Sequence, residues 1–293
     1  MRKKTTRLLI ALLLAVIAAA AVYFIPTEKI PWLQKAKDWT SEKVNIAVDA
    51  ADSWISGLGS GSEILPAAET ENLEMARVKS GVLVAYTGFT VSYDGSHKIP
   101  EWVAYELTSE EAFATDVSRS DEFWEDTRVK NYPKLSDYRG SGFDRGHMCP
   151  SNDQRWSKEA NYDTFSLLNM VPQDHDYNAG IWLTAEKWVR NVAGKYGKVY
   201  VATGPVISDR MDTIGSGVAV PVSCWKALLV INDGKASSIA LCIPQSVKKG
   251  SIQDYVMSVN ELEKLTGLDL FYNLPDDVEE QIEDMKSTKG WQM

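Results

Sequence analysis

Histidine and cysteine are both scarce in this chain, with three of each among 293 residues. Three cysteines are too few for a disulfide-rich scaffold. Three histidines exclude a multi-histidine metal cage unless cysteines or carboxylates complete it. An excess of positive charge is also missing. The formal net charge is −9, which argues against a protein that grips nucleic acid through a broad basic surface.

The composition that remains is that of a globular protein, with 44% hydrophobic and 24% charged residues. This balance excludes wholesale disorder, a collagen-like chain and a coiled coil. The length allows one large domain or two small ones.

The N-terminal segment, residues 1–25, reads as a targeting or membrane segment. Four cations, the last of them Arg7, precede an uncharged apolar run over residues 8–25. As a helix this run would be about 27 Å long, close to the hydrocarbon thickness of a bilayer. Its length and Pro26 favour an uncleaved signal-anchor, whereas the alanines at 18–21 offer the cleavage site of a signal peptide. We expect export in either case, with the protein membrane-anchored and facing the periplasm or exterior, or secreted.

Residues 26–65 read as a stalk or linker, and residues 66–293 as the folded domain. Apolar residues recur at roughly helical spacing before the Gly- and Ser-rich stretch 57–62, which breaks any helix. Beyond it, hairpin patterns at 82–107 and 218–243 alternate irregularly with helical patterns, the strongest at 179–196. Such mixing predicts an α+β fold with a central antiparallel sheet and flanking helices.

The stretch Asp144-Arg145-Gly146-His147 is the first candidate for chemistry. It is a polar tetrapeptide that contains a glycine and stands at the end of an apolar segment expected to be a strand. Imidazole titrates near neutrality, so His147 is a candidate general base that takes a proton from water. A histidine that only forms a hydrogen bond in a turn is the alternative.

A second candidate is the series Asn178, Trp182, Glu186 and Arg190, spaced four residues apart. On a helix that starts near Asn178 these side chains share one broad side. An amide oxygen can bind Mg²⁺ directly, a carboxylate can hold water on the metal, and a guanidinium can face phosphate oxygens. The alternative is an Asn N-cap followed by an exposed Glu–Arg pair.

Taken together, these stretches resemble the DNA/RNA non-specific endonucleases of the ββα-metal (His-Me finger) superfamily, in particular its endonuclease G-like members. The resemblance runs from about residue 86 to residue 274. Besides the two stretches above, it rests on Pro-Glu-Trp-Val-Ala-Tyr at 100–105, Asn-Met-Val-Pro-Gln at 169–173 and the segment 266–275.

The resemblance implies a ββα-metal finger and an enzyme that hydrolyses phosphodiester bonds of DNA and RNA. It further implies dependence on Mg²⁺, with Mn²⁺ as a substitute, little selectivity for sugar or sequence, and 5′-phosphate ends. A non-catalytic, membrane-tethered nucleic-acid-binding module on the same fold is one alternative. An envelope adaptor whose stalk is the working part is the other.

The residue roles that the resemblance implies agree with the chemistry of the side chains. His147 would be the general base and Asn178 the only direct protein ligand of the metal. Glu186 would orient a metal-bound water. Arg119 matches, more loosely, the upstream family arginine that stabilises the charge on phosphorus. Arg145 and Arg190 would be phosphate-side or supporting cations, while Asp144 and Asn169 would brace the loop.

The cysteines leave several alternatives open. Cys149 is either a small core residue or a zinc ligand together with His147, Cys224 and Cys242. A three-residue turn at 232–234 would place Cys224 opposite Cys242, so they could form a disulfide or remain two reduced core thiols. The other two histidines, at positions 97 and 175, are expected in exposed polar loops, and the sequence suggests no partner for either.

Overall fold

The computed structural model describes residues 72–208, 210–291 and 293. The predicted targeting segment (residues 1–25), the predicted stalk (residues 26–65) and residues 66–71 of the predicted domain lie outside these residues. These assignments therefore stay predictions. Among the described residues, no helix combines the length and the apolar character needed to cross a membrane.

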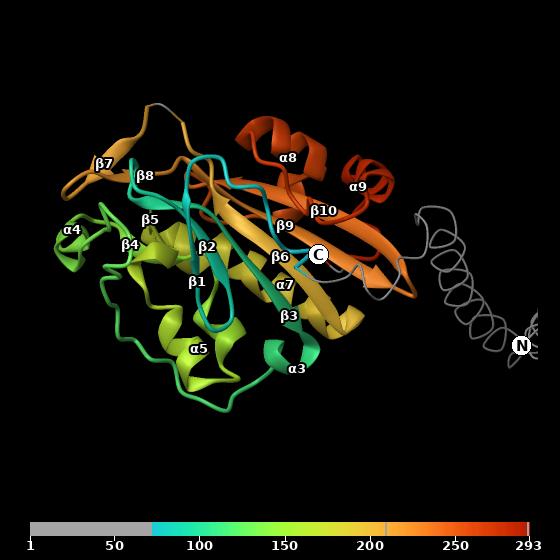
Figure 1. Ribbon diagram of the computed structural model, residues 1–293, viewed down its shortest axis with the longest axis horizontal. Helices are drawn as coiled ribbons and strands as arrows, with labels where there is room; N and C mark the ends of the chain where they lie inside the picture. Colours follow the sequence, from blue (N-terminus) through green and yellow to red (C-terminus); the bar gives the residue numbers. More distant parts are fainter. Residues whose placement is uncertain (1–71, 209, 292) are drawn as a thin grey trace, which may run out of the picture. The chain divides into compact units, whose positions relative to one another are not determined.

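A seven-stranded antiparallel sheet forms the centre of the domain (Figure 1), in the order β1-β2-β3-β6-β9-β10-β11. The strands are β1 (Val82–Ala85), β2 (Thr90–Asp94), β3 (Ile99–Thr108), β6 (Lys198–Pro205), β9 (Ser223–Asn232), β10 (Lys235–Pro244) and β11 (Val256–Met257). The β2–β3 and β9–β10 hairpins confirm the two predicted hairpin regions. The predicted α+β fold around an antiparallel sheet is correct.

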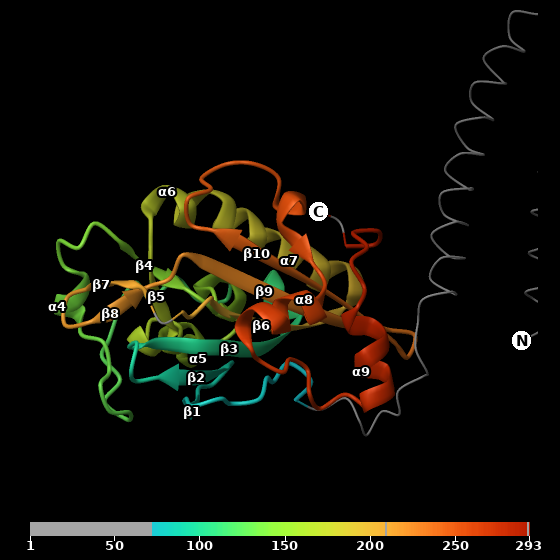
Figure 2. The same ribbon diagram turned by 90° about the horizontal axis from the view of Figure 1, so that it is seen from above.

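Both faces of this sheet are buried, because apolar side chains occupy alternate positions on both sides of its central strands. One core contains Leu228 of β9 and Val103 of β3 together with helix α7 (Leu183–Tyr196). The other contains Leu229 and Ala104 with helices α8 (Val259–Thr266) and α9 (Asp276–Glu283), which are red in Figures 1 and 2. One face of the sheet thus supports α7, the helix that carries Glu186 and Arg190.

Most of the predicted site residues lie on a unit of two short strands, β4 and β5, followed by the helix α7. Strand β4 (Asp144–His147) pairs antiparallel with β5 (Met170–Gln173), and Gly146 lies opposite Val171. A Cβ at Gly146 would overlap the side chain of Gln173, so only glycine fits this position. The chain then continues through α6 (His175–Tyr177) and the π-helical turn Asn178–Trp182 into α7.

Smaller elements connect these parts. They are α3 (Ser109–Ala112), α4 (Leu135–Tyr138), η2 (Ser151–Gln154), α5 (Lys158–Asp163), η3 (Leu167–Asn169), β7 (Asp212–Ile214), β8 (Val218–Val220) and η5 (Ile252–Tyr255). Figure 1 shows the β7–β8 pair beside β4 and β5, and β8 contacts β5.

The helix predicted over residues 179–196 begins later and is irregular at its start. Asn178 lies in the π-helical turn, whose Gly180 has the non-helical angles φ −103 and ψ −107. A Cβ on Gly180 would lie 2.5 Å from the backbone oxygen of Lys248, so the chain approaches too closely for any other residue. Asn178 is therefore not an N-cap; Asp174 caps α6 instead. A π turn of this kind is frequent at functional sites.

The expected pairing of Cys224 with Cys242 is wrong by one residue. The turn between β9 and β10 has two residues, Asp233 and Gly234, both with positive φ, and Asn232 pairs with Lys235. Cys224 therefore faces Ile243. A one-residue shift moves a side chain to the other face of a sheet, so the two sulfurs belong to different cores. All three cysteines are free.

Candidate functional site

His147 lies at the end of β4 in an apolar enclosure. Its ring centroid is 5.0 Å from that of Phe165 and 5.7 Å from that of Phe123. The indole Nε1 of Trp182 donates a hydrogen bond to the His147 backbone oxygen at 3.3 Å, which fixes this end of the strand against the π turn. Nε2 of His147 is buried, and no atom of the described chain forms a hydrogen bond with it.

Two arginines flank the His147 enclosure. The guanidinium carbon of Arg119 lies 4.9 Å from the Phe165 ring centroid, and that of Arg145 lies 4.0 Å from the Phe123 ring centroid. Burial, with the charges of Arg119 and Arg145, lowers the pKa of His147 to about 3. The imidazole is therefore neutral at physiological pH, the form in which a general base starts the reaction, but the lowered pKa also makes it a weaker proton acceptor than an ordinary histidine.

Asn178 is held by a carboxylate of the strand that carries His147. Its Nδ2 donates a hydrogen bond to Oδ2 of Asp144 at 3.0 Å. No other hydrogen bond of its side chain occurs in the structure of residues 72–208, 210–291 and 293, so the amide oxygen is free to bind a ligand. Asp144 thus braces the candidate metal ligand, whereas Asn169 braces the β4–β5 loop through bonds to both backbone groups of Cys149.

The two other histidines have partners that the sequence did not suggest. Nδ1 of His175 lies 2.9 Å from Oδ2 of Asp144, and this contact raises the pKa of His175. Nδ1 of His97 lies 2.5 Å from Oδ2 of Asp94 in the β2–β3 turn. His175 is exposed as expected, while His97 is about one-third exposed, with a side-chain exposure of 34%.

Glu186 is buried one turn into α7. Burial raises its pKa to about 7, opposed by the charge of Lys226, reinforced by that of Asp153 and opposed again by Arg190 and Arg119. Arg119 therefore lies within electrostatic range of both Glu186 and His147. The carboxylate is poised between its two protonation states near neutral pH, which is typical of functional sites.

Arg190 is part of a buried polar cluster rather than an exposed cation. Its Nη1 forms an ion pair with Oδ1 of Asp153 at 2.8 Å, and Asp153 is fully buried. The hydroxyl of Tyr105 donates to the other oxygen of Asp153 at 2.9 Å. Of the two roles expected for Arg190, this placement supports the structural one.

The donor set suits a hard, hydrated cation better than zinc. Within the described part of the chain, no group of three or more His, Cys, Asp or Glu side chains is arranged to hold a metal ion. Cys149 is fully buried, and its sulfur accepts a contact from Gln154 at 3.6 Å, as a core residue would. The free amide oxygen of Asn178 is the kind of neutral oxygen ligand that Mg²⁺ takes together with water.

Four residues of the site were not identified from the sequence. They are Phe123, Phe165, Asp153 and Lys226. Only Lys226 carried a local signal, because it is a single cation inside the apolar run 224–231. The others come from segments that meet only in the folded chain.

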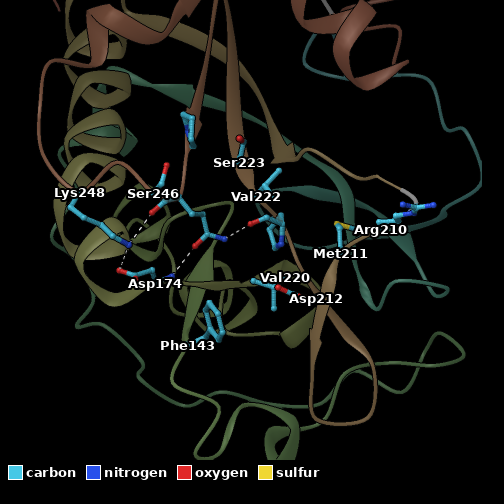
Figure 3. Close-up of a pocket in the computed structure, with 13 residues that line it drawn as sticks. Phe143, Asp174, Arg210, Met211, Asp212, Val220, Val222, Ser223, Ser246 and Lys248 are labelled. Carbon is cyan, nitrogen blue, oxygen red and sulfur yellow. Dashed lines mark hydrogen bonds and ion pairs between the residues drawn. The ribbon is translucent and has the colours of Figure 1, made fainter.

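An open pocket of about 870 Å³ is lined by residues other than those predicted for the site (Figure 3). Its wall includes Phe143 and Asp174, neighbours in sequence of Asp144 and His175, but none of the six predicted site residues lines it. Lys248 forms an ion pair with Asp174 at 2.6 Å across this wall. The predicted site residues are therefore not part of the wall of this pocket.

Comparisons with known proteins support the resemblance seen in the sequence. The nuclease of Nostoc sp. is 32% identical over 216 residues, covering 69% of this chain and 77% of that protein. The zebrafish mitochondrial nuclease EXOG is 31% identical over 207 residues, covering 64% of this chain. This chain spans 60% of the length of that second relative.

A solved structure shares the fold. The chain matches a chain in the crystal structure of the EndoG/EndoGI complex with a TM-score of 0.64 and 28% identity, covering 68% of this chain and 89% of that one. A family model described as DNA/RNA non-specific endonuclease matches residues 69–277. The expected recognition and the ββα-metal fold are thereby confirmed, and the chain belongs to the DNA/RNA non-specific endonuclease family.

Proposed function

We propose that this protein is an endonuclease that hydrolyses phosphodiester bonds of both DNA and RNA with the help of Mg²⁺ and leaves 5′-phosphate ends. The observation that carries the proposal is the neutral imidazole of His147, whose Nε2 has no hydrogen-bond partner among the described residues, on a strand that also holds Asn178 through Asp144. Strand β4 thus carries the candidate base, His147, and through Asp144 it also holds the candidate metal ligand, Asn178.

The residues divide the reaction among them. His147 takes a proton from the water that attacks phosphorus. The bond from phosphorus to the 3′ oxygen breaks, so the phosphate stays on the 5′ oxygen, and the leaving 3′ oxygen takes up a proton from solvent to become a hydroxyl. Arg119 and Arg145 favour the extra negative charge that develops on phosphorus.

Asn178 would hold the metal through its amide oxygen, with Glu186 in ionised form as its carboxylate neighbour on the helix side. A bound Mg²⁺ supplies Lewis-acid stabilisation of the scissile phosphate and of the leaving oxygen. No base-reading module was found in the sequence, and a site that addresses one phosphate carries little sequence information.

The test is digestion of plasmid DNA and single-stranded RNA with Mg²⁺, with Mn²⁺ and with EDTA. We expect cleavage of both substrates that EDTA abolishes and that His147→Ala lowers by a factor of about a thousand or more. His97→Ala is the matched control, because it removes a histidine bound to Asp94 and should leave turnover unchanged. Binding without metal-dependent cleavage would instead support the non-catalytic alternative.

Two further measurements test the finer parts of the proposal. End-labelling of the products with and without prior phosphatase treatment should reveal 5′-phosphates; 5′-hydroxyl ends would contradict the proposed direction of cleavage. Activity should also fall as salt rises, because local arginines must attract phosphate against a net charge of −9. Salt-independent cleavage would argue against that account.

A further inference from the structure

The segment from Arg128 to Arg145, called the basic segment below, has a charge opposite to that of the rest of the chain. It carries five arginines and lysines and two aspartates, a formal charge of +3, which leaves −12 for the other residues. A polyanion is repelled by the net charge of the protein and attracted by this segment. The basic segment is therefore suited to contact a run of phosphate groups.

Both acidic residues of the basic segment are engaged in hydrogen bonds to other parts of the fold. The carboxylate of Asp137 is buried and accepts the backbone N–H groups of Lys134 and Ser216, each at 2.8 Å, which ties α4 to the turn between β7 and β8. Asp144 is the carboxylate that holds Asn178. No ion pair joins either carboxylate to a cation of the basic segment, all of whose residues are described.

Three cations of the basic segment are exposed, namely Lys130, Lys134 and Arg139. None of them forms an ion pair with any residue that the structure describes. Arg128 differs, because its Nη2 binds Oδ2 of the buried Asp126 at 2.6 Å. The three unpaired cations can therefore approach a phosphate without giving up a partner.

The backbone that carries these three cations is anchored to the domain. The side chains of Val129 and Tyr138 are buried in the core that contains α7. The hydroxyl of Tyr93, on β2, donates a hydrogen bond to the backbone oxygen of Asn131 at 2.8 Å. The cations thus project from a fixed surface, which lowers the entropic cost of binding an extended partner.

The basic segment leads directly into the candidate site. Its last residue, Arg145, lies on β4 two positions before His147. Figures 1 and 2 both show α4 at the end of the domain where β4 and the β7–β8 pair lie. Arg139 precedes Arg145 by six positions, so their Cα atoms are at most about 22 Å apart. One DNA strand has a phosphate about every 3.4 Å along the helix axis, so this distance spans up to about six phosphates.

We propose that the basic segment is a phosphate-binding surface that holds the nucleic-acid strand on one side of the scissile bond through Lys130, Lys134 and Arg139. This inference rests on the proposed nuclease function. The partner is a chain of several phosphodiesters, since a single phosphate could not contact cations spread over residues 130–139. Contacts to phosphates position a strand and carry no sequence information, which fits a site without a base-reading module.

The first variant of the test is Lys130→Gln/Lys134→Gln/Arg139→Gln in the full chain. The three side chains are exposed and unpaired, so we expect the variant to fold, which urea unfolding verifies. Binding of a labelled single strand of about 20 nucleotides is measured with Mg²⁺ in the His147→Ala background, which suppresses cleavage. The slope of log Kd against log salt should become shallower by about 2, at about 0.7 per lost contact, and the affinity at about 0.1 M salt should fall about tenfold to a hundredfold.

The matched control is Lys79→Gln/Lys264→Gln/Lys286→Gln, which changes the net charge by the same amount. These lysines lie around α8, on the other face of the sheet, where Lys79 contacts the backbone oxygen of Thr266 and Lys286 pairs with Glu261. We expect the control to keep the salt slope and the affinity of its parent. Equal changes in the two triple variants would assign the effect to net charge and overturn the inference, as would an unchanged slope in the first variant.

Steady-state kinetics with His147 intact separate strand binding from the hydrolytic step. On the same long strand the first triple variant should raise KM about tenfold or more and leave kcat unchanged, because its cations contact the strand away from the reacting phosphate. A lower kcat with an unchanged KM would show a defect at the hydrolytic centre and overturn the inference. If the wild type does not cleave the strand at all, the proposed function fails, while the two salt slopes still decide whether the basic segment binds nucleic acid.

Discussion

The side-chain amide of Asn178 donates a hydrogen bond to Oδ2 of Asp144 at 3.0 Å, and this bond decides which atom of the amide is free. Because Nδ2 is engaged by the carboxylate, Oδ1 remains as the candidate metal ligand. Asp144 also accepts the contact from Nδ1 of His175, so one carboxylate orients two neighbouring side chains of the helical segment.

Removal of this carboxylate should weaken metal use. In Asp144→Ala the Asn178 amide loses its orientation, and loss of such supporting partners typically costs about 10–100-fold in metal affinity. Mg²⁺ titration of cleavage should show this as a higher half-saturating concentration. Asp254→Ala, on η5, is the control for the loss of one negative charge. Equal half-saturating concentrations in Asp144→Ala and wild type would mean that the hydrogen bond is not needed to orient the ligand.

Gly146→Ala should destabilise the β4–β5 pair. The added Cβ would overlap the Gln173 side chain, and such overpacking costs about 1–3 kcal/mol in the free energy of unfolding. Urea unfolding measures the loss. Gln173→Ala opens the space, so the double variant Gly146→Ala/Gln173→Ala should recover part of the stability that Gly146→Ala alone loses. Purely additive losses would show that the two positions do not clash.

Local sequence patterns were enough to predict most of the sheet. Alternating apolar residues and turn residues predicted the β2–β3 and β9–β10 hairpins, and the helical pattern at 179–196 predicted most of α7. The hairpin pattern at 82–107 contains three strands rather than two, because a turn divides its first part into β1 and β2. Patterns of this kind depend on neighbours in sequence, which is why they can be read without the fold.

The sequence-based predictions were wrong where contacts between distant parts of the chain determine the structure. The three residues 232–234 all suit a turn, and the choice of a two-residue loop depends on which side chains of β9 and β10 enter which core. The start of α7 depends on the approach of Lys248 to Gly180. The charge cluster around Glu186 joins η2, α7 and β9, and no spacing in the sequence reveals it.

His147 should make the protein lose stability in acid. Its pKa is lowered to about 3 in the folded state, against 6.5 for the ordinary side chain. Between these values the unfolded chain takes up a proton that the folded chain does not, so the free energy of unfolding falls as pH falls through this window, by up to about 1.4 kcal/mol per unit. Urea unfolding of His147→Gln should lack this part of the decline. Parallel pH profiles of wild type and variant would show that His147 is not buried in neutral form.

Glu283 on α9 should have the opposite pH dependence. Burial, with the charges of Glu263, Glu279 and Asp269, raises its pKa from 4.5 to about 9. Above pH 4.5 the unfolded chain releases this proton while the folded chain keeps it, so the free energy of unfolding falls as pH rises towards 9. Glu283→Gln keeps a neutral side chain and should be more stable than the wild type at pH 8, by about 1 kcal/mol or more. Glu280→Gln, exposed on the same helix, is the matched control. An equal gain from both variants would assign the effect to the net charge of α9 rather than to the burial of Glu283.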